Sequence, residues 1–385
     1  MRIKYFPLLQ KSFLSGGGDI SNVKKKIAWL DTVRVFASFA IIIAHYLMSS
    51  GFDNYPFTRR ICFDAASLGV FLFFAISGWL VVGSLNRSPS LSDFFKRRVI
   101  RVVVPFTMSF IFLGMLFMFT GLIDRDIAGY SPFCRAAYEA NYFENFICAL
   151  PIDMNLFIWL KINFVPFIGE WFMSVIIFMY FLAPPLKWCA ERAPLVTLAV
   201  SIAVSLIVFN ATQELSENGR LAYNWWLVLV RIPEFLFGMI LAIKRDFILK
   251  YRSRLELVAG IIFVAYTIYF LIHKAHTTFL YFDCEPKVFL ISFPTIFLFF
   301  SAVERLNRLP SELMQRFNDL AGISYPIMLI QHPIIFLFEA EFEFERFHSF
   351  GIIYVLLLLI GLIVFLSGFV KRFSEPVEKF FLRRV

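Results

Sequence analysis

Long apolar stretches recur along the chain, separated by shorter polar and charged segments. Ten of them can cross a bilayer as helices, because about 20 apolar residues cover its hydrocarbon core. They lie at 28–49, 65–84, 100–122, 165–186, 194–212, 222–244, 255–273, 287–304, 317–338 and 349–372. The pattern therefore predicts an all-α fold, a polytopic integral membrane helical bundle with about ten transmembrane helices.

An eleventh apolar stretch, 143–160, contains Glu144, Pro151 and Asp153. We interpret it as an interfacial or re-entrant segment within an outer loop at 123–164. The predicted organisation is then a cytoplasmic N-terminal segment at 1–27, a membrane domain at 28–372 and a cytoplasmic C-terminal tail at 373–385. The first apolar stretch is too long and too polar for a cleaved signal peptide, so it is expected to stay as a signal-anchor helix.

The distribution of positive charge supports this topology. With ten spans and both termini in the cytoplasm, 26 of the 37 Lys and Arg residues lie on the cytoplasmic side and nine on the other. This asymmetry is the positive-inside signal of a membrane protein. The net charge of +9 is thereby assigned to the inner leaflet and its lipids, and no nucleic-acid partner is expected.

Ionisable residues in the first span indicate chemistry. Asp31, Arg34 and His45 lie in an otherwise apolar segment, where a charged side chain costs about 2.5–3.5 kcal/mol on insertion scales. Arg34 and His45 are eleven residues apart, which places them near one helix face, about 16 Å apart along its axis. We expect both to line one cavity, with Asp31 paired to Arg34.

Two further elements point to a bound ligand. Arg97, Arg98 and Arg101 stand at the cytoplasmic mouth of the third span, where guanidinium groups one helical turn apart can grip phosphates. Ser77 and Gly78 in the second span permit close approach of a ligand or another backbone. Ordinary membrane anchoring and helix packing are the alternative explanations. No Cys or His spacing indicates a metal site.

Six elements in order give a recognisable combination, and the chain resembles the acyltransferase-three family of bacterial integral membrane acyltransferases. The matching elements are Asp31, Arg34 and His45; Phe73 to Gly78; Arg98, Arg101 and Pro105; Trp171 to Val175 with Tyr180 and Pro184; Arg231, Glu234, Phe235 and Gly238; and Ser324-Tyr325 through Leu329 to His332-Pro333.

This resemblance implies O-acyl transfer from cytoplasmic acyl-CoA, most simply acetyl-CoA, to a cell-envelope carbohydrate, at the bacterial inner membrane. Acyl-CoA is then a co-substrate, with no permanently bound cofactor and no metal. His45 would be the general base, and Arg34, Ser77 or Trp171 would stabilise the oxyanion. Glu170, Trp171 and His332 would serve the acceptor.

Several alternatives stay open. Ile176 and Ile177 occupy positions where many relatives carry Glu-Glu, and Gln331 occupies the usual late histidine position. The late half is similar to glucan succinyl-transfer proteins, so succinyl is an alternative to acetyl. The acceptor can be O-antigen of lipopolysaccharide, exopolysaccharide, periplasmic glucan, another cell-surface or lipid-linked carbohydrate, or a small amphipathic molecule. A glycan or proton-coupled transporter is the rival function, and a structural scaffold for an envelope complex is a third. The sequence does not indicate the oligomeric state.

Overall fold

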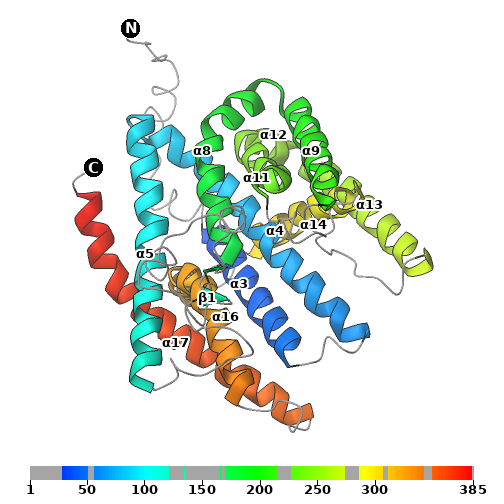
Figure 1. Ribbon diagram of the computed structural model, residues 1–385. Coiled ribbons are helices and arrows are strands. Elements are labelled where there is room, and N and C mark those ends of the chain that lie inside the picture. Colours follow the sequence, from blue (N-terminus) through cyan, green and yellow to red (C-terminus); the bar gives the residue numbers. More distant parts are fainter. Residues whose placement is uncertain are drawn as a thin grey trace.

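The computed structural model describes residues 28–50, 56–120, 134–135, 165–166, 170–214, 227–273, 286–306, 311–341 and 349–383. Almost all of them are helical (Figure 1). The exceptions include two short strands, β1 (Cys134–Arg135) and β2 (Val165–Pro166), which pair antiparallel. The predicted N-terminal segment 1–27 and the stretch 143–160 lie outside the described residues.

The helices follow the apolar stretches of the sequence. They are α3 (Ala28–Ser49), α4 (Pro56–Arg87), α5 (Leu91–Thr120), α8 (Glu170–Arg192), α9 (Pro194–Ala211), α11 (Val228–Ile243), α12 (Arg245–Lys250), α13 (Arg252–His273), α14 (Pro286–Leu306), α15 (Ser311–Ala321), α16 (Ser324–Glu341) and α17 (Ser349–Leu382).

The predicted fold class is confirmed. Within the described residues eight helices are long and apolar enough to cross a membrane, or nine if the bent pair α15 and α16 forms one span. Helix α11, at the sixth predicted span, has 16 described residues, about 24 Å at the rise of an α-helix. It packs between α4, α8 and α9.

Two predicted spans have the wrong limits. The span expected at 165–186 begins as strand β2, and helix α8 starts only at Glu170. The span expected at 317–338 is broken, because α15 and α16 meet at a bend of 59°. The break lies at Gly322, where a side chain would meet the Nζ atom of Lys371 at 2.5 Å. Broken helices within membranes commonly line a cavity.

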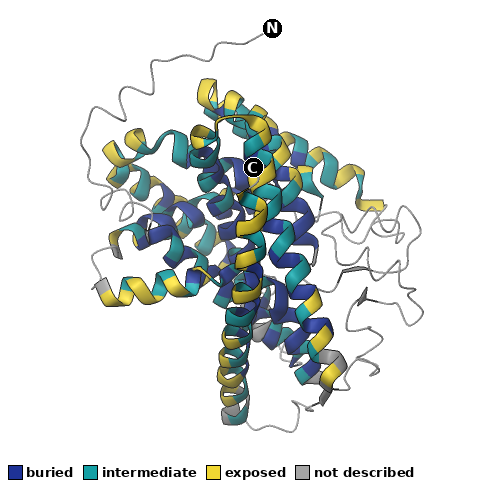
Figure 2. Ribbon diagram, turned by 90° about the vertical axis from the view of Figure 1, so that its left-hand side faces the viewer, coloured by how far each residue is buried: buried dark blue, intermediate teal, exposed yellow. Residues whose placement is uncertain are grey.

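Burial separates the inner helices from the outer ones. In the most apolar part of α4, 67% of the residues are buried, against 11% in both α9 and α13. Figure 2 shows buried positions gathered in the middle of the bundle and exposed ones along its outer helices. The outer apolar faces of α9 and α13 therefore suit contact with lipid, whereas α3, α4 and α11 form the core.

Helix α17 is 34 residues long, about 51 Å at the rise of an α-helix, and so exceeds the thickness of a bilayer core. It continues through most of the segment predicted as a C-terminal tail, and it packs along α5. This packing brings residues near the end of the chain to the arginine residues at the start of α5.

Candidate active site

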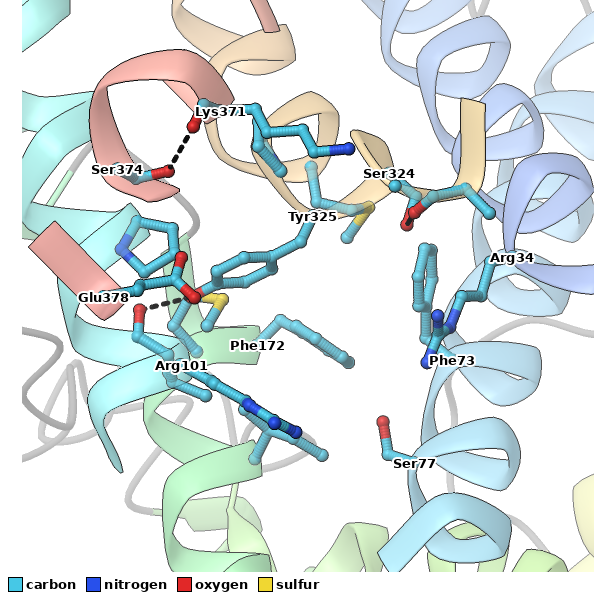
Figure 3. Close-up of a pocket in the computed structure, with 18 of the residues that line it drawn as sticks. Arg34, Phe73, Ser77, Arg101, Phe172, Ser324, Tyr325, Lys371, Ser374 and Glu378 are labelled. Carbon is cyan, nitrogen blue, oxygen red and sulfur yellow. Dashed lines mark hydrogen bonds between the residues drawn. The ribbon is translucent and has the colours of Figure 1, made fainter. Parts of the chain in front are cut away.

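A cavity of about 370 Å³ opens where α3, α4, α5, α8, α17 and the break between α15 and α16 meet. Its lining contains four basic side chains, two acidic ones, hydroxyl groups and an apolar part. Figure 3 shows Arg34 and Ser77 on one wall, Arg101 and Glu378 on the opposite wall, and Lys371 at the top, near Ser324. The cavity is therefore an amphipathic site with an excess of positive charge.

Four of the residues predicted for the site meet in this cavity: Arg34, Ser77, Arg98 and Arg101. They come from three different helices and span 68 positions of the sequence. Arg34 forms the predicted ion pair with Asp31, at 3.1 Å between Nη1 and Oδ1. This pair anchors the guanidinium on α3 and reduces the cost of its charge.

The Arg98 guanidinium is fixed by surrounding groups. It lies over the ring of Tyr180 at 5.2 Å, and its Nη2 donates to the carbonyl oxygen of Leu80 at 3.3 Å. Its Nε is buried and has no hydrogen-bond partner among the residues described. A buried donor without a partner costs free energy, so this position of the Arg98 guanidinium is maintained at a cost.

The wall opposite Arg34 is held by a bond between distant helices. The hydroxyl of Tyr325 donates to the carbonyl oxygen of Val102 at 2.8 Å, which joins the start of α16 to α5. Ser324 and Tyr325 then face the cavity. The sequence analysis identified the motif that begins at Ser324, but it could not predict the contact of Tyr325 with α5.

Lys371 and Glu378 were missed as site residues. Both lie in the last part of α17 and line the cavity, Glu378 on the side of Arg101 and Lys371 next to Gly322. In the sequence they belong to an ordinary charged end of a span, so no local signal distinguished them. Only the packing of α17 along α5 brings them to the site.

His45 lies outside this cavity, so the expectation that Arg34 and His45 line one cavity is wrong for the described structure. The reason is their axial separation of about 16 Å. The cavity lining includes Met328, and His332 follows one helical turn later on α16.

His45 belongs instead to a second polar cluster between α3 and α16. Its Nδ1 lies 2.9 Å from Oε1 and 2.7 Å from Nε2 of the Gln331 side chain. Its ring is stacked on that of His332, with 4.5 Å between centroids and 16° between planes. The predicted base and one predicted acceptor residue are thus in direct contact.

The remaining predicted residues lie elsewhere. Gly78 faces α11, where a side chain would meet the carbonyl oxygen of Phe235 at 1.9 Å, so it serves helix packing. Arg97 is exposed on α5 and does not line the cavity. Trp171 is buried against Phe74, with 6.0 Å between the ring centroids. Glu170 begins α8, and its side chain lies outside the described part.

Of the comparisons with known proteins, one gave a match. A family model described as an acyltransferase domain, that of acyltransferase family 3, matches residues 27–370, nearly the whole chain. No match was found among curated proteins or solved structures. The match ends one residue before Lys371, so the cavity also draws on residues beyond it.

Proposed function

The chain belongs to acyltransferase family 3, and from this premise we propose that it moves an acyl group from cytoplasmic acyl-CoA to a hydroxyl group of a cell-envelope carbohydrate. It is a multi-pass membrane acyltransferase. The acyl-CoA donor, the carbohydrate acceptor and the inner-membrane location with cytoplasmic termini belong to the proposal.

The observation that carries the proposal is the basic cavity. Arg34, Arg98, Arg101 and Lys371 converge there from three helices, α3, α5 and α17. Coenzyme A carries several phosphate groups, and guanidinium groups bind phosphate through charge-assisted, often bidentate hydrogen bonds. A cavity that collects four cations inside a membrane protein is what such a donor requires.

The apolar part of the cavity suits the rest of the donor. Phe73, Phe172, Met173, Ile176 and Met328 line it beyond the basic side chains. The pantetheine arm of coenzyme A is long and slim, so it can lie among these side chains while the phosphates stay near the arginine residues. The thioester then points along α3 towards His45.

We assign donor binding to the basic cavity and proton transfer to the cluster around His45. A neutral imidazole at His45 can take the proton of the acceptor hydroxyl as its oxygen attacks the thioester carbonyl. Arg34 is about 16 Å from His45 along α3, so we assign it to the donor and not to the oxyanion at the reacting carbon. Trp171, buried near the start of α8, stays a proposed oxyanion donor.

The acyl group and the acceptor rest on the resemblance to the family. We propose acetyl as the transferred group, with succinyl as the alternative. The acceptor class is a surface polysaccharide, such as O-antigen, exopolysaccharide or glucan. His332 and Glu170 are proposed to serve this acceptor, because His332 contacts His45 and Glu170 begins the same helix as Trp171.

The test compares wild type with His45→Phe, in which a ring can still stack on His332 but cannot accept a proton. Full-length protein in proteoliposomes is supplied with labelled acetyl-CoA and surface glycan, and O-acyl groups are measured by NMR. We expect His45→Phe to insert normally and to lose about 10²–10⁴-fold in rate. Wild-type protein that transports glycan without acylating it would contradict the proposal.

A further inference from the structure

The amide of Gln331 is the group that faces the proposed base. Gln331 is 3% exposed and sits on α16, with both its Oε1 and its Nε2 within 3 Å of Nδ1 of His45. His332, the next residue, stacks on the imidazole and in turn contacts Phe336, with 4.4 Å between ring centroids. The orientation of the imidazole is thus set from its edge by an amide and from its face by a ring.

The amide can fix either tautomer of His45. If Oε1 accepts from Nδ1–H, the lone pair of the neutral imidazole lies on Nε2, and that atom can take a proton. If Nε2 of Gln331 instead donates to Nδ1, the imidazole carries its proton on its own Nε2 and becomes a hydrogen-bond donor. The choice between the two decides whether His45 is a base or an electrophile.

One arrangement serves the whole reaction. After His45 takes a proton at Nε2, the imidazolium carries hydrogen on both nitrogen atoms, so Nδ1–H again needs an acceptor. An Oε1 that already accepts from Nδ1 meets this need without any rearrangement. An amide that donates to Nδ1 would have to turn over during each reaction cycle.

We propose that Gln331 is a positioning residue that accepts from Nδ1–H of His45 through Oε1, and so places the reactive lone pair on Nε2. This inference rests on the proposed function. In the step it supports, the O–H bond of the acceptor breaks and its proton goes to Nε2. The ester C–O bond forms, the thioester C–S bond breaks, and the leaving thiolate takes the proton from the imidazolium.

A neutral amide suits this position in a membrane. A carboxylate beside His45 would also accept from Nδ1–H, but it would place an ionised group inside the bundle, where charge is costly. The Gln331 amide orients the imidazole without a net charge. The departure from the usual late histidine therefore has a chemical role in this chain.

The direct test is the tautomer of His45 in full-length protein in lipid nanodiscs. The chain has only five histidine residues, so ¹⁵N-histidine NMR can resolve them, and the spectrum of His45→Ala assigns the signal. We expect hydrogen on Nδ1 in wild type. In Gln331→Met this preference is lost. Hydrogen on Nε2 in the wild-type protein would overturn the inference, whatever the activity.

Kinetics supply the second readout. Gln331→Met should lower kcat by about 10²-fold, the effect of a misplaced base, with the KM for acetyl-CoA changed less than about two-fold because the donor cavity is intact. Gln331→Glu should recover part of kcat, since its carboxylate also accepts from Nδ1–H. An unchanged kcat in well-inserted Gln331→Met would overturn the positioning role.

Gln315→Met is the matched control, because Gln315 is exposed on α15 and bonds only to Asp319 among the residues described. It should match wild type in both readouts. If Gln331→Met fails to insert, two other measurements still test whether Gln331 accepts from Nδ1–H of His45. They are the tautomer of His45 in the wild-type protein and the kcat of Gln331→Glu. Wild-type protein without acyl transfer would refute the proposed function, whereas the spectrum would still decide whether Gln331 orients His45.

Discussion

Gly78 and Gly238 each lie against the backbone of the other's helix. A Cβ atom on Gly78 would stand 1.9 Å from the carbonyl oxygen of Phe235, and one on Gly238 would stand 1.9 Å from that of Ala75. Helices α4 and α11 therefore cross at these two glycines. Small residues at such crossings allow close approach of membrane helices, where packing is a main source of stability.

Gly78→Ala and Gly238→Ala should both destabilise the protein. Overpacking typically costs about 1–3 kcal/mol, and backbone atoms on the other helix have little room to move, so we expect the upper part of this range. The measurement is thermal unfolding of purified protein in nanodiscs.

The matched control for this pair is Gly260→Ala on α13. Nothing described lies within 4 Å of a Cβ built at Gly260. Alanine there should be neutral or stabilising by up to about 1 kcal/mol, from helix propensity. Equal loss of stability in all three variants would show that close packing at the helix crossing is not the cause of the loss.

The arginine residues of the cavity should determine donor affinity. Replacing Arg98 or Arg101 by Ala removes charge-assisted hydrogen bonds to phosphate, each worth about 1.5–3 kcal/mol. Affinity for coenzyme A, measured by calorimetry, should fall by roughly 10–100-fold per variant. Lysine at either position should restore it only in part, because an ammonium lacks the planar guanidinium fork.

Arg97 offers the control for donor binding. It lies on the same helix but is exposed and does not line the cavity. Arg97→Ala should leave the affinity for coenzyme A within about two-fold of wild type. A loss as large as that of Arg98→Ala would mean that general surface charge, and not the cavity, holds the donor.

Neither member of the Arg231–Glu234 pair should be replaceable on its own. Both side chains are 0% exposed, and Nη1 and Oε1 are 3.1 Å apart. Removing one partner leaves the other charge buried without its ion pair, which costs about 3–5 kcal/mol. Arg231→Met and Glu234→Met should each be strongly destabilised, whereas the double variant should recover much of the loss.

An exposed pair on α8 serves as the comparison for this experiment. Lys187 and Glu191 are 2.7 Å apart, but the Glu191 side chain is 44% exposed. Glu191→Met should change the free energy of unfolding by less than about 1 kcal/mol. A double variant at 231 and 234 no better than the single variants would show that the pair acts through specific contacts and not through mutual neutralisation.

The positive-inside pattern predicts where each end of the chain lies. Reporter fusions after Lys250 and at the C-terminus should report the cytoplasm, and a fusion near Glu341 should report the outside. The reason is the excess of Lys and Arg in the segments assigned to the cytoplasm. A C-terminus outside would contradict this topology and would require 143–160 to cross the membrane.

The sequence by itself determined the membrane fold and identified four residues of the cavity: Arg34, Ser77, Arg98 and Arg101. Long apolar stretches form helices in lipid, because each backbone polar group must find a hydrogen-bond partner within the segment. Asp31, Arg34 and Arg98 stood out because charge in or beside such a stretch is costly, and the pair at three-residue spacing was predictable from helix geometry alone.

Only the tertiary structure decided how these residues are grouped. Helical periodicity fixed the face shared by Arg34 and His45, but the surrounding helices placed one in a basic cavity and the other beside Gln331. The approach of Lys371 was equally hidden, because it depends on how α17 packs along α5, which is distant in the chain. Contacts between distant segments are set by the packing of whole helices, and no local pattern in one sequence records them.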